Sequence, residues 1–199
     1  MKPLTVGLLV SGSSGFIVDT SVGRLRSRAG ASRQSKERRR LFEEREGRRP
    51  YESPRVVREG LGRLEGGRGI VLVTDKKALY ARVVREVFRE GQIEHRVVSG
   101  RGSKGPWSEL FWANHTAAKV RYGMSRLIRR SWCGSKSRRH LAWHLASFTM
   151  WHNGSRWRTN RSKRTPAMEE GLFRRRLTPE ELFGWRQDWG ARSRRLDAA

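Results

Sequence analysis

The chain has 199 residues, of which 44 are Lys or Arg and 19 are Asp or Glu, so its formal net charge is +25. This balance excludes an acidic tail, argues against most small-molecule enzymes of the cytosol, and favours a polyanionic partner, most simply nucleic acid. Hydrophobic residues make up 36% of the chain, so a core is expected to involve only part of it. The single cysteine, Cys133, excludes an intramolecular disulfide and a zinc site built from several thiolates.

Arginine dominates the basic residues, with 36 Arg against 8 Lys. Arginine suits bidentate contacts to phosphate, whereas the base composition of a genome raises its frequency without any selection for binding. Both explanations remain open on composition alone.

The sequence lacks a membrane-spanning pattern. The apolar stretch near the start, Leu4–Val10, is far shorter than the ~20 residues that cross a bilayer, and a Ser/Gly run at 11–15 follows it. We therefore expect a soluble, cytoplasmic protein with no membrane partner.

The first third of the chain divides by composition. Leu4–Val10 and Phe16–Val22 are β-rich runs around a Ser/Gly turn and predict a hairpin within residues 1–23. Residues 24–68 are dense in Arg and Glu, which is typical of a solvated helix or a mobile insertion. Gly60–Gly69 is expected to be a linker.

A β–α–β unit is predicted next. Gly69–Asp75 contains four consecutive apolar residues, which indicate a parallel strand buried on both faces. Ala78–Phe88 has apolar residues at helical spacing, and His95–Ser99 is a second short strand. Two strands joined in this way are expected to be parallel neighbours.

The remaining sequence predicts helices and a basic tail. A glycine-rich loop over 100–106 precedes a long helix over Asn114–Arg130, and a second helix over Ser137–His152 brings Leu141, Leu145 and Phe148 together. The tail, 154–199, is basic with scattered Trp. Within it, Thr178–Glu181 has the cap, proline and acids of a helix start.

Three patterns suggest chemistry that their surroundings disfavour. Gly100–Gly105 matches G-x-G-x-x-G, but Pro106 follows and no acid lies between Glu109 and Glu169, so a basic phosphate-contacting loop or a plain surface loop is favoured over a dinucleotide site. The His residues 140, 144 and 152 share a helical spacing, yet neighbouring arginines would repel zinc. Cys133 has no nearby acid to support nucleophilic catalysis.

Asp75 is the strongest candidate site residue. It stands at the carboxyl end of the predicted central strand, where open α/β sheets place ligand sites and where a carboxylate can bind a divalent metal. An aspartate here also commonly caps the helix that begins near Lys76. The pattern leaves both alternatives open.

Several segments resemble the C-terminal part of insertion-sequence transposases of the DDE type, which have an RNase H-like core. The resemblance is carried by Thr74-Asp75 with Tyr80 and, most specifically, by the run Asn114–Lys136. Arg164–Met168 with Gly171-Leu172, and Lys2–Val6, match further phrases of the family. The implied fold is a partial α/β RNase H-like domain with a mixed sheet, C-terminal helices and a basic tail, its core remainder spanning residues 69–153.

The resemblance also implies a metal site. Such cores hold two Mg²⁺ ions that promote cleavage and strand transfer at a phosphodiester. Asp75 matches the second carboxylate, and Asn114 stands where related members have a Glu, seven residues before Arg121. The implied catalytic and metal-binding residues are therefore Asp75 and Asn114. An amide supplies no charge and cannot act as a base, so we expect weak metal binding.

The first carboxylate of the family lies on a strand upstream of the Lys2–Val6 segment, so the resemblance implies an N-terminally truncated and catalytically impaired transposase. DNA is the expected partner, with a second copy of the chain as a further one. The expected DNA-contacting residues are Arg101, Lys104, Lys119, Arg121, Arg126, Arg129, Arg130 and Lys136. The alternatives are a non-catalytic basic nucleic-acid-binding protein and an unexpressed relic without a function.

Overall fold

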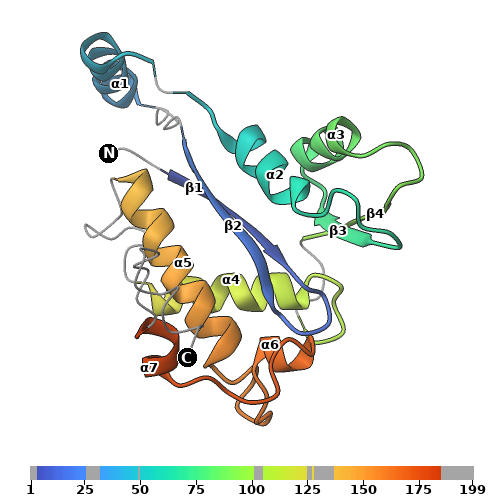
Figure 1. Cartoon of the computed structure of the whole chain (residues 1–199). Helices are drawn as coiled ribbons and strands as arrows, with labels where there is room; N and C mark the ends of the chain where they lie inside the picture. Colours follow the sequence, from blue (N-terminus) through green and yellow to red (C-terminus); the bar gives the residue numbers. More distant parts are fainter. Residues whose placement is uncertain are drawn as a thin grey trace, which may run out of the picture. The chain divides into compact units, whose positions relative to one another are not determined.

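Figure 1 shows the computed structural model, which describes residues 4–25, 32–48, 50–100, 105–124, 127 and 137–184. The described part is mixed α/β, with helices and two small sheets. The chain divides into two compact units, Met1–Thr149 and Met150–Ala199.

The hairpin predicted at the start of the chain is confirmed. Strands β1 (Leu4–Val10) and β2 (Ile17–Arg24) pair in antiparallel register from Leu4 opposite Arg24, with an irregularity between Leu9 and Val10. The intervening turn contains Gly15 at a φ of 77°, a conformation that favours glycine.

The predicted β–α–β unit is also confirmed. Strand β3 (Val71–Asp75) pairs in parallel with β4 (Glu94–Val98), and helix α3 (Ala78–Val87) connects them. In the described part of the chain the antiparallel and parallel pairs form separate two-stranded sheets instead of one mixed sheet.

The expectation that β3 is buried on both faces is wrong. Leu72 is 7% exposed, whereas its neighbour Val71 is 45% exposed. Successive side chains of a strand point to opposite faces, and α3 packs only against the face that carries Leu72. An apolar run therefore did not require cover on both sides.

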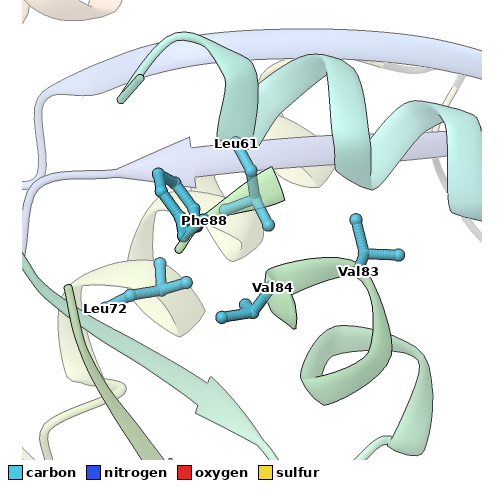
Figure 2. Packing of buried hydrophobic residues seen from close by; sticks show 5 residues of the cluster. All are labelled: Leu61, Leu72, Val83, Val84 and Phe88. Atoms are coloured by element: carbon cyan, nitrogen blue, oxygen red, sulfur yellow. The ribbon is translucent and has the colours of Figure 1, made fainter. Parts of the chain in front are cut away.

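Helix α2 (Ser53–Gly62) joins the two sheets through a shared apolar cluster, and the linker expected from residue 60 begins inside this helix. Figure 2 shows Leu61 of α2 and Leu72 of β3 packed with Val83 and Val84 of α3 and with Phe88, which follows that helix. Leu9 of β1 packs against the same cluster. The segment 24–68 therefore contributes to the core, because Val56 and Leu61 of α2 are buried.

The preceding helix, α1 (Arg33–Glu46), differs from α2 in having no buried residue. Ser32 caps its start by accepting from Ser35 N–H at 3.2 Å. Two ion pairs join residues that lie one turn apart on this helix: Arg39 with Glu43, and Arg40 with Glu44. Pairs of this kind, of which Arg40–Glu44 is exposed and Arg39–Glu43 half-buried, stabilise a helix only slightly.

Two glycines let α2 approach the hairpin closely. A Cβ on Gly7 of β1 would lie 2.6 Å from Val56 Cγ1, and a Cβ on Gly23 of β2 would lie 2.6 Å from Val56 Cγ2. Val56 itself is 2% exposed. Val56 of the helix therefore packs directly against the hairpin backbone at two glycine positions.

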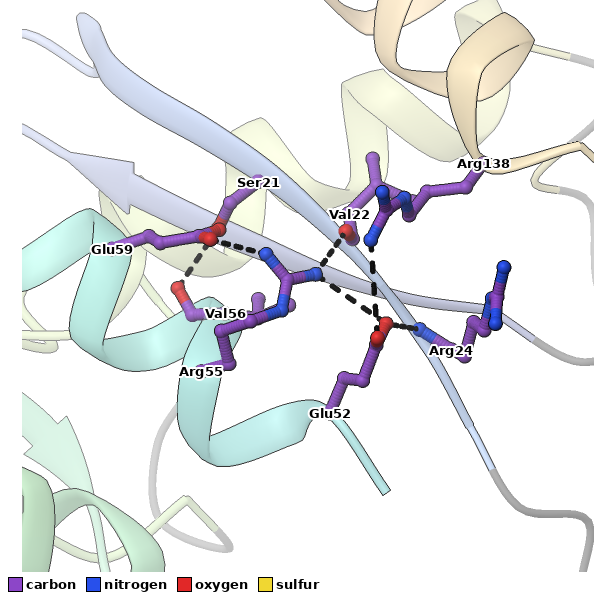
Figure 3. Close-up of polar contacts among 8 residues, drawn as sticks. All are labelled: Ser21, Val22, Arg24, Glu52, Arg55, Val56, Glu59 and Arg138. Atoms are coloured by element: carbon purple, nitrogen blue, oxygen red, sulfur yellow. Dashed lines mark hydrogen bonds and ion pairs between the residues drawn. The ribbon is translucent and has the colours of Figure 1, made fainter. Parts of the chain in front are cut away.

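A polar network holds the same helix to β2 (Figure 3). Glu52 accepts from Arg24 N–H at 2.5 Å, and Arg55 donates to Val22 O at 3.0 Å while it pairs with Glu59. Ser21 Oγ donates to Val56 O at 2.9 Å. The backbone hydrogen bond from Arg24, followed by the charge of Arg55, lowers the pKa of Glu52 below 4.5.

Helix α4 (Phe111–Gly123) begins three residues earlier than predicted, and its C-cap Met124 has extended backbone, so its predicted continuation through 130 is wrong at that point. Residues 125, 126 and 128–130 lie outside the described residues. Gly123 ends the helix beside α5 (Arg138–Gly154): a Cβ there would lie 2.6 Å from the ring of Phe148. Leu141, Leu145 and Phe148, which the sequence predicted to lie together on one helix, are all buried.

The second unit contains two short helices with side-chain caps. Thr165 caps α6 (Pro166–Glu169), and Thr178 with Glu181 forms a capping box at α7 (Pro179–Phe183). The helix start predicted at Thr178 is confirmed. Leu177 N–H donates to Gly154 O, which joins this segment to the end of α5 within the unit.

The close packing of α2 against the hairpin leads to a prediction about stability. Gly7→Ala and Gly23→Ala each place a methyl group against Val56, so each should lower the free energy of unfolding by about 1–3 kcal/mol, measured by urea unfolding. Gly12→Ala is the matched control, because a Cβ there has no atom within 4 Å and should change stability little. Equal unfolding midpoints for all three variants would contradict this packing.

The Glu52 network generates a pH prediction. The lowered pKa of Glu52 means that its ionised form stabilises the fold above the unfolded value near 4.5, and that this contribution is lost as the pH falls through the lower folded value. Glu52→Gln should therefore cost about 1–2 kcal/mol at neutral pH and progressively less in acid. Urea unfolding across pH measures the difference, and a difference independent of pH would overturn the assignment.

Candidate functional site

Asp75 lies at the carboxyl end of β3 with its side chain exposed. Its Oδ1 accepts from Lys77 N–H at 3.1 Å, and the helix that follows has Lys77 as its N-cap with no side-chain cap. Asp75 therefore orders the turn before α3 without capping the helix itself. On its other side the chain returns at Gly100, where a Cβ would lie 3.5 Å from Asp75 Cβ.

Tyr80 and Lys77 complete the surroundings of Asp75. Burial of the Tyr80 side chain, and then the nearby charge of Asp75, raise the pKa of the phenol. Lys77 Nζ lies 5.7 Å from the centroid of the Tyr80 ring. The Asp75 carboxylate consequently acts on the phenol of Tyr80 in the first turn of α3, and Lys77 contacts the ring of the same residue.

Asn114 lies in the first turns of α4, also exposed, and its N–H donates to Leu110 O at 2.9 Å. Aromatic contacts fix this end of the helix: the rings of Phe111 and His115 stack at 5.3 Å, and a Cβ at Gly15 would lie 2.8 Å from Trp112 Cε3. Thr116 Oγ1 donates to Gly15 O at 3.3 Å. The hairpin turn thus sets the position of Asn114.

The described residues do not complete a two-ion metal site. Within them, no hydrogen bond joins Asp75 to Asn114, and no group of three or more His, Cys, Asp or Glu could hold a metal ion. Asp19, on β2, pairs with Arg63 at 3.4 Å. Two divalent ions carry four positive charges, so one carboxylate and one amide compensate them poorly.

The predicted DNA-contacting residues are described only in part. Lys119 is half-buried and Arg121 is exposed, both on α4. Six others lie outside the described residues: Arg101, Lys104, Arg126, Arg129, Arg130 and Lys136. Cys133 and most of the G-x-G-x-x-G loop also lie outside them. Of the three spaced histidines, His140 and His144 are exposed whereas His152 is 1% exposed, so they do not share one environment.

A group of residues on α5 was not among the predicted contacts. Arg139 lies with its guanidinium carbon 4.9 Å from the centroid of the Trp143 ring, and Trp143 is 56% exposed. The signal was present in the sequence: residues 110–168 contain 13 Lys or Arg and no Asp or Glu. In the sequence, this lack of acids was evidence against a dinucleotide site and against nucleophilic catalysis at Cys133, and was not connected with a binding surface on α5.

Comparisons of the chain with protein families, with curated proteins and with solved structures found no match. Across the described ranges, helices are too short or too polar to cross a membrane.

The basic α4 surface generates a binding prediction. Arg121→Gln should weaken binding of a duplex DNA and reduce the slope of log K against log salt by about 0.9, the change expected for one lost phosphate contact. Fluorescence anisotropy over a range of salt measures both quantities.

Arg40→Gln is the matched control, because Arg40 is also exposed on a helix but pairs with Glu44 at 2.8 Å. Its salt slope should equal that of the unmodified chain. A flat salt dependence for the unmodified chain would indicate that the positive charge reflects composition and not DNA binding.

Proposed function

We propose that this chain acts on DNA as a DDE-type insertion-sequence transposase with a partial RNase H-like core, in a form impaired in cleavage and strand transfer. Asp75 is the carboxylate at the centre of this proposal, and Asn114 is its expected partner. Mg²⁺ is the expected metal, held weakly.

The position of Asp75 carries the proposal. Asp75 is an exposed carboxylate at the carboxyl end of a parallel strand. Gly100, in the segment that follows the neighbouring strand β4, lies beside it. Metal-dependent phosphoryl-transfer sites use carboxylates held by a sheet in this way, because the strand fixes the oxygen while the loop leaves it open. Asp19, on β2, differs from Asp75 in that it is paired with Arg63.

The arrangement of elements supports the same proposal. An antiparallel hairpin and a parallel β–α–β unit share one apolar cluster through α2, as expected for parts of a single α/β core. The strong positive charge suits a DNA substrate. Charge alone, however, favours DNA binding and not cleavage.

The absence of three clustered acids among the described residues favours a second candidate function. In that case the chain binds nucleic acid through its basic surfaces and performs no chemistry. The two functions differ in one observable, which is divalent metal binding at Asp75.

Metal binding at Asp75 tests the proposal. In NMR spectra, Mn²⁺ should broaden the amide signals of Lys77 and Gly100 selectively, at millimolar concentration because the site has little charge, and Asp75→Asn should abolish the effect. Asp19→Asn is the matched control and should leave the broadening unchanged. Absence of selective broadening would favour the second function.

Plasmid nicking completes the test. We expect the chain to produce no Mg²⁺-dependent nicking above background, because one carboxylate does not balance two divalent ions. Robust nicking that persists in Asp75→Ala would overturn the site assignment, whereas nicking that requires Asp75 would overturn only the expected impairment.

A further inference from the structure

One face of α5 presents an exposed aromatic ring among positive charges and outside the candidate metal site. Arg139, His140 and Trp143, which we call the α5 stacking surface, are all exposed. The guanidinium of Arg139 lies over the Trp143 ring at 4.9 Å, and the His140 ring lies 5.4 Å from the Trp143 ring at a tilt of 45°. The three side chains thus form one continuous patch.

The core does not account for this surface. The buried face of α5 is made by Leu141, Leu145 and Phe148, which are between 0% and 7% exposed. On the exposed side, the residues one turn after Trp143 are the small Ala146 and Ser147, both exposed. The indole is therefore large, water-facing and bordered by small residues toward the end of the helix.

The positive charge around the α5 stacking surface indicates which kind of partner it can bind. Arg138–Gly154 contains no acid, and neither does the wider stretch 110–168 with its 13 Lys or Arg. A partner helix with an ordinary apolar face would offer these charges no counterion, whereas a nucleic-acid strand supplies phosphates for the cations and a flat base for the ring. A single strand suits the surface better than a duplex, because only unpaired bases expose their faces for stacking.

We propose that the α5 stacking surface binds single-stranded DNA, with one unpaired base stacked on Trp143 and an adjoining phosphate bound by Arg139. This inference rests on the proposed function in taking DNA as the partner. It adds a site separate from Asp75 and a preference for unpaired strands, which a DNA-processing protein meets at opened ends.

The experiment compares three fluorescent probes: a 20-nucleotide oligothymidine, an abasic oligonucleotide of the same length, and a duplex. The unmodified chain should bind the oligothymidine more tightly than the abasic strand, because stacking adds to phosphate attraction. Trp143→Ala should weaken binding of the oligothymidine about tenfold and leave its affinity for the abasic strand unchanged. Trp143→Phe should retain most of the preference, because it keeps an aromatic face.

Tyr51→Ala is the matched control, since Tyr51 is 53% exposed but lies beside Glu52 and outside the acid-free stretch. It should not alter the preference for bases, and circular dichroism should show that all variants fold. Equal affinities of the unmodified chain and Trp143→Ala for oligothymidine would overturn the inference while duplex binding still supported the proposed function. If the chain binds none of the three probes, both the inference and the proposed function are overturned.

Discussion

The close seating of α2 on the hairpin is the interaction on which the first unit depends. Val56 occupies the space that side chains at Gly7 and Gly23 would fill, and Leu61, further along the same helix, enters the cluster with β3 and α3. A single helix thus serves two sheets that share no backbone hydrogen bond within the described residues. Because apolar burial supplies most of the folding free energy, a substitution that disturbs the packing of this helix is expected to destabilise both sheets.

Polar contacts then fix the orientation that packing leaves free. Arg55 and Glu52 tie the first turn of α2 to the backbone of β2, where edge-strand groups would otherwise need water. Arg58 of α2 pairs with Glu86 of α3 and so joins these two helices directly. Helices α2 and α3 also pack against β3, so these contacts fix the position of the strand end at which Asp75 lies.

The distribution of charge separates structure from binding. In residues 4–109 many acids pair with arginines one turn away or across a helix contact, as with Glu43, Glu59 and Glu86. Residues 110–168 contain no acid, so their cations depend on acids elsewhere, as Arg138 does on Glu52, or on water and external anions. This asymmetry is the physical basis for the proposal that α4 and α5 bind nucleic acid.

The sequence by itself determined the local elements: the hairpin, the β–α–β unit, the buried face of α5 and the cap at Thr178 follow from spacing and residue type, because they depend on neighbours in the chain. It also placed Asp75 at a strand end. Only the tertiary structure decided that α2 belongs to the core, that Val71 is exposed and that α4 ends at Gly123, since each depends on packing between segments distant in sequence. The stacking of Arg139 on Trp143 is an intermediate case: the i, i+4 spacing allowed it, but whether that face is exposed depended on which side of α5 the core covers.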